Sequence, residues 1–229
     1  MVLQRNGDIK AVIGTAFAIS GNMAMSAWHN FKDNGYLPTD VVILCKEIKA
    51  SVILRSSPVV AVRDYDVDDD WVTLELNSTV FLNHVTLCPE AELPPDRDGA
   101  GQSRVVGVRD FPAGLIDSCR HLTVGSMKAK IWNYSAPFAS QPTKKLRLED
   151  QFPSENECMV NVRGGRVLGS CGAPYFADNG KVFAFHVGSI NDADSEDAMT
   201  STGHSHASYS EGRVLVRLKS FTSTYSYLF

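Results

Sequence analysis

The sequence predicts an all-β protein made of two antiparallel barrels, and three observations lead to that fold class. Short runs rich in β-branched and aromatic residues recur along the 229 residues, and turn-forming residues separate them. Convincing helical periodicity is absent from the sequence. A stretch rich in proline, glycine and charge, residues 89–102, divides the runs into two halves of similar size. Closing each half into a barrel removes the strand edges that an open sheet would have to protect.

Each predicted strand is a short apolar run bounded by turn signals. The run Val12–Ile19 begins a hairpin whose second strand ends near His29, and an acidic turn precedes the alternating run Trp71–Leu76. Two polar segments, Ser135–Pro153 and Asn191–Gly212, are predicted to be irregular, the second as either a functional lid or a disordered insertion. The remaining predicted strands are Val41–Cys45, Val59–Val62, Val105–Val108, His121–Trp132, Met159–Val162, Val182–Val187 and Val214–Leu218.

Composition and charge exclude several classes of protein. The 44% hydrophobic content supplies an ordinary core, and a net charge of -4 gives no electrostatic reason to expect a nucleic-acid or membrane partner. No apolar run approaches the length of about 18 residues that a membrane-spanning helix needs. The five cysteines are widely spaced, with no CxxC or Cys/His zinc pattern. We therefore expect a cytoplasmic protein without a metal or other cofactor.

Two motifs in the first half are candidates for acid-base chemistry. The turn after Met25-Ser-Ala-Trp presents His29, although a single histidine is more often structural than catalytic. Asp66-Val-Asp-Asp-Asp70 runs directly into the strand that begins at Trp71. A carboxylate at such a position can accept the Nδ1 hydrogen of an imidazole and fix its tautomer. The alternatives are a solvated acidic loop or a calcium site, although the glycine pattern of an EF-hand is missing.

The third motif, Gly169-Ser-Cys171-Gly-Ala-Pro174, is a candidate nucleophile turn. Small residues around Cys171 allow the backbone to turn sharply, so that amide hydrogens can point at a developing oxyanion. The alternative is a glycine turn that contains a buried cysteine. The presence of His29 and the acidic turn earlier in the chain favours the interpretation of Cys171 as a nucleophile over that of a buried cysteine.

Together these motifs resemble those of the chymotrypsin superfamily. The matching elements are Trp28-His29 after a Gly-Thr-x-Phe hairpin, Asp70 at the head of a strand that closes Leu-Glu-Leu, and Gly-Ser-Cys-Gly-Ala-Pro. The order and spacing of the three motifs agree with the superfamily, and they cover nearly the whole chain.

The resemblance implies a specific architecture and a catalytic triad. It implies two six-stranded barrels with the active site in the cleft between them: residues 1–92 carry His29 and the acid, 93–103 form a linker, and 104–229 carry Cys171. By the family's strand pattern, the acid is Asp70 and not Asp66, Asp68 or Asp69. The oxyanion hole is expected at the amides of Gly169 and Cys171.

Cysteine in the nucleophile position is similar to the 3C and 3C-like proteases of positive-strand RNA viruses. Phe185-His186-Val187-Gly188 resembles their His-x-Gly element, whose histidine lies in the pocket for the residue before the scissile bond. The resemblance implies a polypeptide substrate, such as a viral polyprotein in the host cytoplasm, cleaved after Gln or Glu. Arg166 replaces a hydroxyl residue of those relatives, and near the pocket its guanidinium would favour an acidic side chain.

Two other functions are compatible with the same motifs. One is a cellular, cytosolic trypsin-like protease in which cysteine has replaced serine. The other is an inactive pair of barrels that binds protein or RNA, for which Lys144, Lys145 and Arg147 form the visible basic cluster. The intact set of His29, Asp70 and Cys171 argues against an inactive module, because binding alone has no chemical need for all three.

Overall fold

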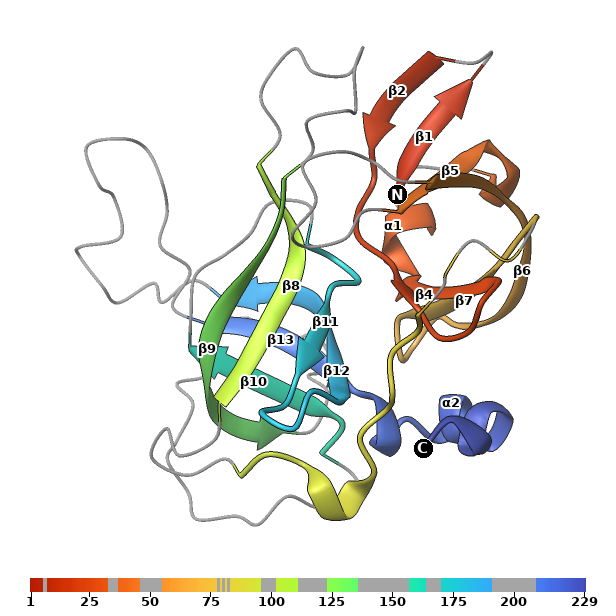
Figure 1. Ribbon diagram of the computed structural model, residues 1–229. Coiled ribbons are helices and arrows are strands. Elements are labelled where there is room, and N and C mark those ends of the chain that lie inside the picture. The colour runs from red at the N-terminus through yellow and green to blue at the C-terminus, as the bar shows by residue number, and fades with distance from the viewer. Residues whose placement is uncertain are drawn as a thin grey trace, which may run out of the picture.

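Antiparallel strands in two sets dominate the computed structural model (Figure 1). The structure describes residues 1–5, 8–32, 37–45, 55–77, 79, 81, 83–95, 102–110, 123–135, 157–163, 170–190 and 209–229. The predicted basic cluster at 144–147 and most of both predicted loops lie outside these residues.

The first set is a seven-stranded antiparallel sheet in the order β2-β1-β5-β6-β7-β4-β3. One end of the sheet brings the hairpin that precedes His29 beside the strand that follows Asp70, because Ala27 of β4 pairs with Trp71 of β7. The strands are β1 (Val2–Arg5), β2 (Asp8–Val12), β3 (Phe17–Ala18), β4 (Met23–Ala27), β5 (Val41–Cys45), β6 (Arg55–Asp66) and β7 (Trp71–Leu76).

The second set is a closed barrel in the order β10-β13-β12-β11-β8-β9. Its core includes Tyr175, Phe183 and Val160, which are completely buried. The strands are β8 (Gln102–Asp110), β9 (Thr123–Ser135), β10 (Met159–Arg163), β11 (Pro174–Phe176), β12 (Val182–Ile190) and β13 (Tyr209–Val214). The predicted antiparallel β-architecture is confirmed, but the pair of six-stranded barrels is not, because the first set is a seven-stranded sheet.

Helices are short. The single turn α1 (His29–Lys32) follows β4, and α2 (Lys219–Tyr225) follows the barrel. Among the described residues, 3-10 turns span Pro38–Asp40, Glu90–Glu92, Leu215–Arg217 and Ser226–Leu228.

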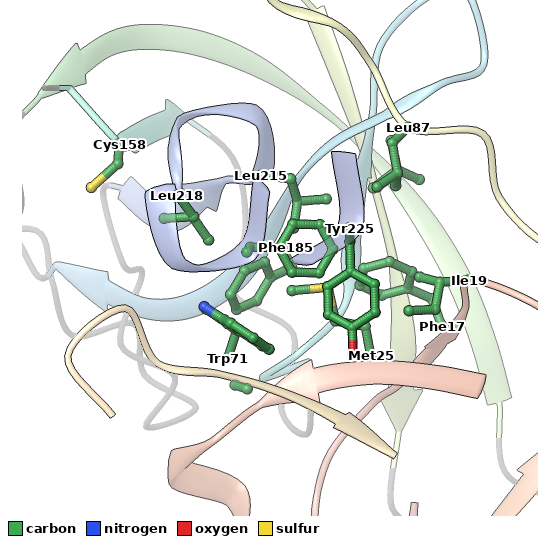
Figure 2. Close-up of a cluster of buried hydrophobic side chains, with 13 residues drawn as sticks. Phe17, Ile19, Met25, Trp71, Leu87, Cys158, Phe185, Leu215, Leu218 and Tyr225 are labelled. Atoms are coloured by element: carbon green, nitrogen blue, oxygen red, sulfur yellow. The ribbon is translucent and has the colours of Figure 1, made fainter. Parts of the chain in front are cut away.

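A cluster of buried residues, here called the central cluster, combines side chains from both halves of the chain with side chains of α2 (Figure 2). Phe221 and Tyr225 of α2 meet the Trp71 ring edge-on, with ring centroids 5.3 and 6.2 Å away. The Trp71 Nε1–H also donates a hydrogen bond of 2.9 Å to the Ser220 hydroxyl. The cluster comprises Phe17, Ile19, Met25, Ala27, Trp71, Leu87, Cys158, Val182, Phe185, Leu215, Leu218, Phe221 and Tyr225.

Two strand predictions and one loop prediction need correction. The run Val12–Ile19 is interrupted, because β2 ends at Val12 and β3 begins at Phe17. The predicted strand Val214–Leu218 contributes only its first residue to β13, and a 3-10 turn follows. The predicted loop Asn191–Gly212 is wrong at its end, since residues 209–212 form strand pairs with β12. Backbone pairing with a neighbouring strand has overridden the polar composition of that segment.

Candidate active site

Cys171 lies in a tight turn just before β11. The Ala173 amide donates to the Ser170 carbonyl at 2.6 Å, which closes the turn, and Gly172 has a φ of +86°. Glycine adopts this left-handed conformation without the steric cost that a side chain imposes. The Cys171 side chain is half-buried and its thiol is free.

Two residues from the first half of the chain contact this turn: Thr15, between β2 and β3, and Asn30 of α1. Thr15 donates its backbone N–H to the Cys171 carbonyl at 2.9 Å, and the Asn30 side chain donates to the same oxygen at 3.1 Å. A Cβ atom at Gly172 would stand 2.2 Å from the Thr15 carbonyl oxygen. The two halves of the chain therefore meet at the candidate nucleophile, and only glycine fits beside it.

His29 is the first residue of α1, and Asp70 holds it from the turn between β6 and β7. The His29 amide donates to Asp70 Oδ1 at 2.8 Å, and His29 Nδ1 lies 2.7 Å from Asp70 Oδ2. The Asp70 carbonyl accepts the Trp28 amide at 3.1 Å. Asp70 has a φ of +56°, a strained value for a residue with a side chain, and these hydrogen bonds stabilise it there.

The other aspartates of this turn have different partners. Asp66 Oδ1 accepts the amides of Asp68 and Asp69 at 2.9 and 2.8 Å, which stabilises the turn itself. Asp69 accepts the Ser220 hydroxyl at 3.0 Å. Asp70 is thus the member of the acidic turn that contacts the imidazole.

The electrostatics of His29 link it to Cys171 as well as to Asp70. Burial lowers the pKa of His29, but hydrogen bonds with the Asp70 and Cys171 side chains, together with their charges, raise it to about 10. Because Nδ1 is engaged by Asp70, Nε2 is the ring nitrogen that remains for Cys171. The imidazole therefore lies between a carboxylate and a thiol, which is the set of groups that nucleophilic cysteine catalysis uses.

His186 of β12 lies next to the nucleophile turn. Gly172 donates its amide to the His186 carbonyl at 2.7 Å, and His186 donates its amide to the Ala173 carbonyl at 2.8 Å. The His186 ring is buried, with Nδ1 2.7 Å from the hydroxyl of Tyr175. Burial raises the pKa of Tyr175 well above its ordinary value, so this partner stays a neutral phenol.

The other predicted substrate-binding residues have different outcomes. Val187 is half-buried and packs against the central cluster, and β12 bulges between His186 and Gly188. Gly169 and Arg166 lie outside the described residues. The second oxyanion donor and the influence of Arg166 on specificity therefore stay predictions.

Sequence reasoning missed two polar residues of this region. Asn30 directly follows the candidate histidine, and it is buried against the Cys171 carbonyl and the Ser26 hydroxyl, at 3.1 Å from each. Its position after His29 was the available signal. Tyr175 gave no signal, because its contact with His186 depends on the pairing of β11 with β12.

No group of three or more His, Cys, Asp or Glu side chains in the described part of the chain is arranged to hold a metal ion. No helix among the residues that the structure describes is long and apolar enough to cross a membrane.

Comparison with known proteins finds similarity in structure. No family model and no curated protein sequence matches the chain. The HtrA-type protease AlgW with a decapeptide aligns with a TM-score of 0.56 at 11% identity, covering 94% of this chain and 52% of AlgW. The active form of the Rv3671c protease from M. tuberculosis aligns with a TM-score of 0.56 at 14% identity, covering 92% and 72%. The MamO protease domain from Magnetospirillum magneticum gives 0.51 at 13% identity, covering 90% and 82%.

At these identities the similarity is one of fold. The chain spans about half the length of AlgW (52%) and larger parts of the other two proteins. It therefore has the fold of these proteases, which is the chymotrypsin-like architecture that its motifs resemble.

Proposed function

We propose that the chain is a cysteine endopeptidase in which Cys171 is the nucleophile, His29 the acid and base, and Asp70 the orienting carboxylate. The observation that carries the proposal is the position of His29, whose ring engages Asp70 at 2.7 Å on one side and Cys171 on the other. A partly buried imidazole that pairs with a carboxylate beside a half-buried thiol serves nucleophilic catalysis.

The geometry supports a two-step hydrolysis. The Cys171 thiolate attacks the carbonyl carbon of the scissile peptide bond, and the resulting oxyanion is stabilised by the Cys171 amide and, as predicted, the Gly169 amide. The His29 imidazolium gives its proton to the departing amine, which leaves a thioester on Cys171. His29, now neutral, takes a proton from water, and the hydroxide releases the acid product and the free thiolate.

Two features of the compared proteins support an activity on polypeptides. AlgW, an HtrA-type protease, was solved with a decapeptide, and a Ser343Ala form of Rv3671c is described as inactive. The cysteine in place of serine is a property of this chain's own Gly-Ser-Cys-Gly turn. Viral polyprotein processing and cleavage after Gln or Glu depend on the sequence resemblance around His186, and they stay predictions.

The test is turnover of a peptide library combined with alkylation. Iodoacetamide at neutral pH should block cleavage and label Cys171. The Cys171→Ala substitution should lower kcat/KM by at least about a thousandfold, because the nucleophile is lost. Cys88→Ala and Cys158→Ala are matched controls, since both cysteines are buried. Full activity of folded Cys171→Ala would rule the proposal out.

A further inference from the structure

A carboxylate lies on the strand pair that follows His186. In the antiparallel pairing of β12 with β13, Gly188 is opposite Glu211. Glu211 Oε2 stands 3.5 Å from the point where a Cβ of residue 188 would be. Because Gly188 has no side chain, nothing from that residue covers the carboxylate.

The charge of Glu211 is poorly compensated. Glu211 is half-buried, and burial raises its pKa even though the nearby Arg213 acts in the opposite direction. Arg213 directs its terminal nitrogens elsewhere, to Cys158 Sγ at 3.5 Å and to the Asp68 carbonyl at 3.1 Å. Among the described residues, no lysine or arginine forms an ion pair with Glu211. A cation that reached this carboxylate would recover interaction energy lost on burial.

Glu211 also lies on the strand pair that borders the nucleophile turn. The two backbone hydrogen bonds between His186 and residues 172–173 place β12 directly beside Cys171. Gly188 is two residues beyond His186 along β12, which is at most roughly 7 Å because the strand bulges between them. Tyr175 connects the two places, because its hydroxyl lies 2.7 Å from His186 Nδ1 and 3.4 Å from the Glu211 carbonyl oxygen.

We propose that Glu211 is a specificity-determining residue that selects peptides with a lysine or arginine side chain close to the scissile bond. The inference rests on the proposed peptidase function and names its substrate class. It opposes the sequence-based prediction of cleavage after Gln or Glu, because a carboxylate that contacts the substrate repels an acidic side chain. A long basic side chain suits the site because its flexible stem can lie over Gly188 while its charged end meets the carboxylate.

The first experiment compares cleavage profiles. A mixed peptide library is digested with the wild-type protein, with Glu211→Gln, and with the control Glu92→Gln, whose carboxylate pairs with Lys181 on the surface at 2.6 Å. The Gln variant keeps the shape of residue 211 and removes its charge. We expect Lys or Arg to be enriched within about four residues of the cut for the wild-type and control proteins. Glu211→Gln should reduce that preference about tenfold, equivalent to about 1.4 kcal/mol.

Three results would overturn the inference: no basic preference near the cut, an acidic preference there, or a basic preference that Glu211→Gln leaves unchanged. The acidic outcome would instead support the prediction made for Arg166.

The second experiment does not need turnover, and so it separates this inference from the proposed function. The Cys171→Ala protein is titrated by calorimetry with a lysine-containing peptide and with its norleucine twin. The lysine peptide should bind about tenfold more tightly, and the difference should disappear when Glu211→Gln is added. Equal affinities would refute the role of Glu211 even if the enzyme cleaves peptides. Selective binding without any cleavage by the wild-type protein would refute the protease and leave the recognition site standing.

Discussion

Asp70 holds His29 through both of its carboxylate oxygens, one at 2.7 Å from ring Nδ1 and the other 2.8 Å from the backbone amide nitrogen. The second contact fixes the start of α1 as well as the ring. The side chain of Asp70 therefore determines both where the imidazole stands and which nitrogen faces Cys171.

Asp70→Asn should lower kcat/KM by about ten- to a hundredfold. The asparagine retains the shape of the side chain, but it removes the charge and presents an N–H where Nδ1 needs an acceptor, so the tautomer is no longer fixed. The loss is expected to be smaller than in a serine enzyme, because a thiolate-imidazolium pair needs less help. Asp68→Asn is the control, since Asp68 is exposed. An equal loss in both variants would exclude a special role for Asp70.

Cys171→Ala should lower the pKa of His29 from its value of about 10. Burial already lowers this pKa, and the variant removes the hydrogen bond and the charge of Cys171, which raise it. Titration of the His29 ring resonances by NMR measures the change, with Cys88→Ala as the control. An unchanged His29 titration would mean that the thiol and the imidazole do not interact.

The raised pKa of His29 should also appear in the pH dependence of stability. The folded-state pKa of about 10 lies above the ordinary value of 6.5, so protonation of His29 stabilises the folded state. That contribution is fully present below pH 6.5 and is lost as the pH rises towards 10. The difference in unfolding free energy between wild-type protein and His29→Gln, measured with urea, should shrink over that range. A constant difference would contradict the linkage.

Gly172→Ala should destabilise the protein by more than about 3 kcal/mol, because strain at positive φ adds to a severe clash with the Thr15 carbonyl. Gly180→Ala is a closely matched control. Gly180 has a similar φ of +81°, but a Cβ there would have nothing within 4 Å. It should cost about 1 kcal/mol from backbone strain alone. Similar urea midpoints for the two variants would show that the close approach of the Thr15 carbonyl does not constrain residue 172.

Phe221→Ala should cost about 3 to 5 kcal/mol of unfolding free energy, because it leaves a cavity beside Trp71 in the central cluster. Tyr227→Ala, two residues beyond α2, removes a ring that is 73% exposed and should change stability by less than about 1 kcal/mol. Thermal or urea unfolding compares the two. A small effect of Phe221→Ala would mean that α2 is dispensable for packing.

The sequence could predict the placement of His29 and Asp70 because each depends on local structure. His29 follows the β3–β4 hairpin, and Asp70 ends a turn just before the alternating strand β7. Adjacent pairing of β4 with β7 then brings together two residues that are 41 positions apart. The Gly-Ser-Cys-Gly turn was recognisable for the same reason, since its small residues specify a sharp bend locally.

The elements that escaped prediction depend on distant partners. In α2, the segment Lys219–Tyr225 has only two large apolar residues among serine and threonine, and its helix is stabilised by packing on Trp71. Glu211 was assigned to a polar loop by composition. Its strand exists because β12 pairs with it and because Gly212 lets the backbone approach the Tyr175 ring. Neither contact can be predicted from the hydrophobic periodicity of the local sequence.

The packing of α2 on Trp71 has a consequence for how the chain folds during its synthesis on the ribosome. Translation delivers Met25 and Trp71 long before Leu215, Leu218 and Phe221, although all five belong to one cluster. Chains generally begin to fold from the N-terminal side as they emerge, so the first sheet is left with an uncovered apolar face during synthesis. A nascent chain that pauses before α2 has been made is therefore a ready target for chaperones, and its central cluster closes only once residue 225 has left the exit tunnel.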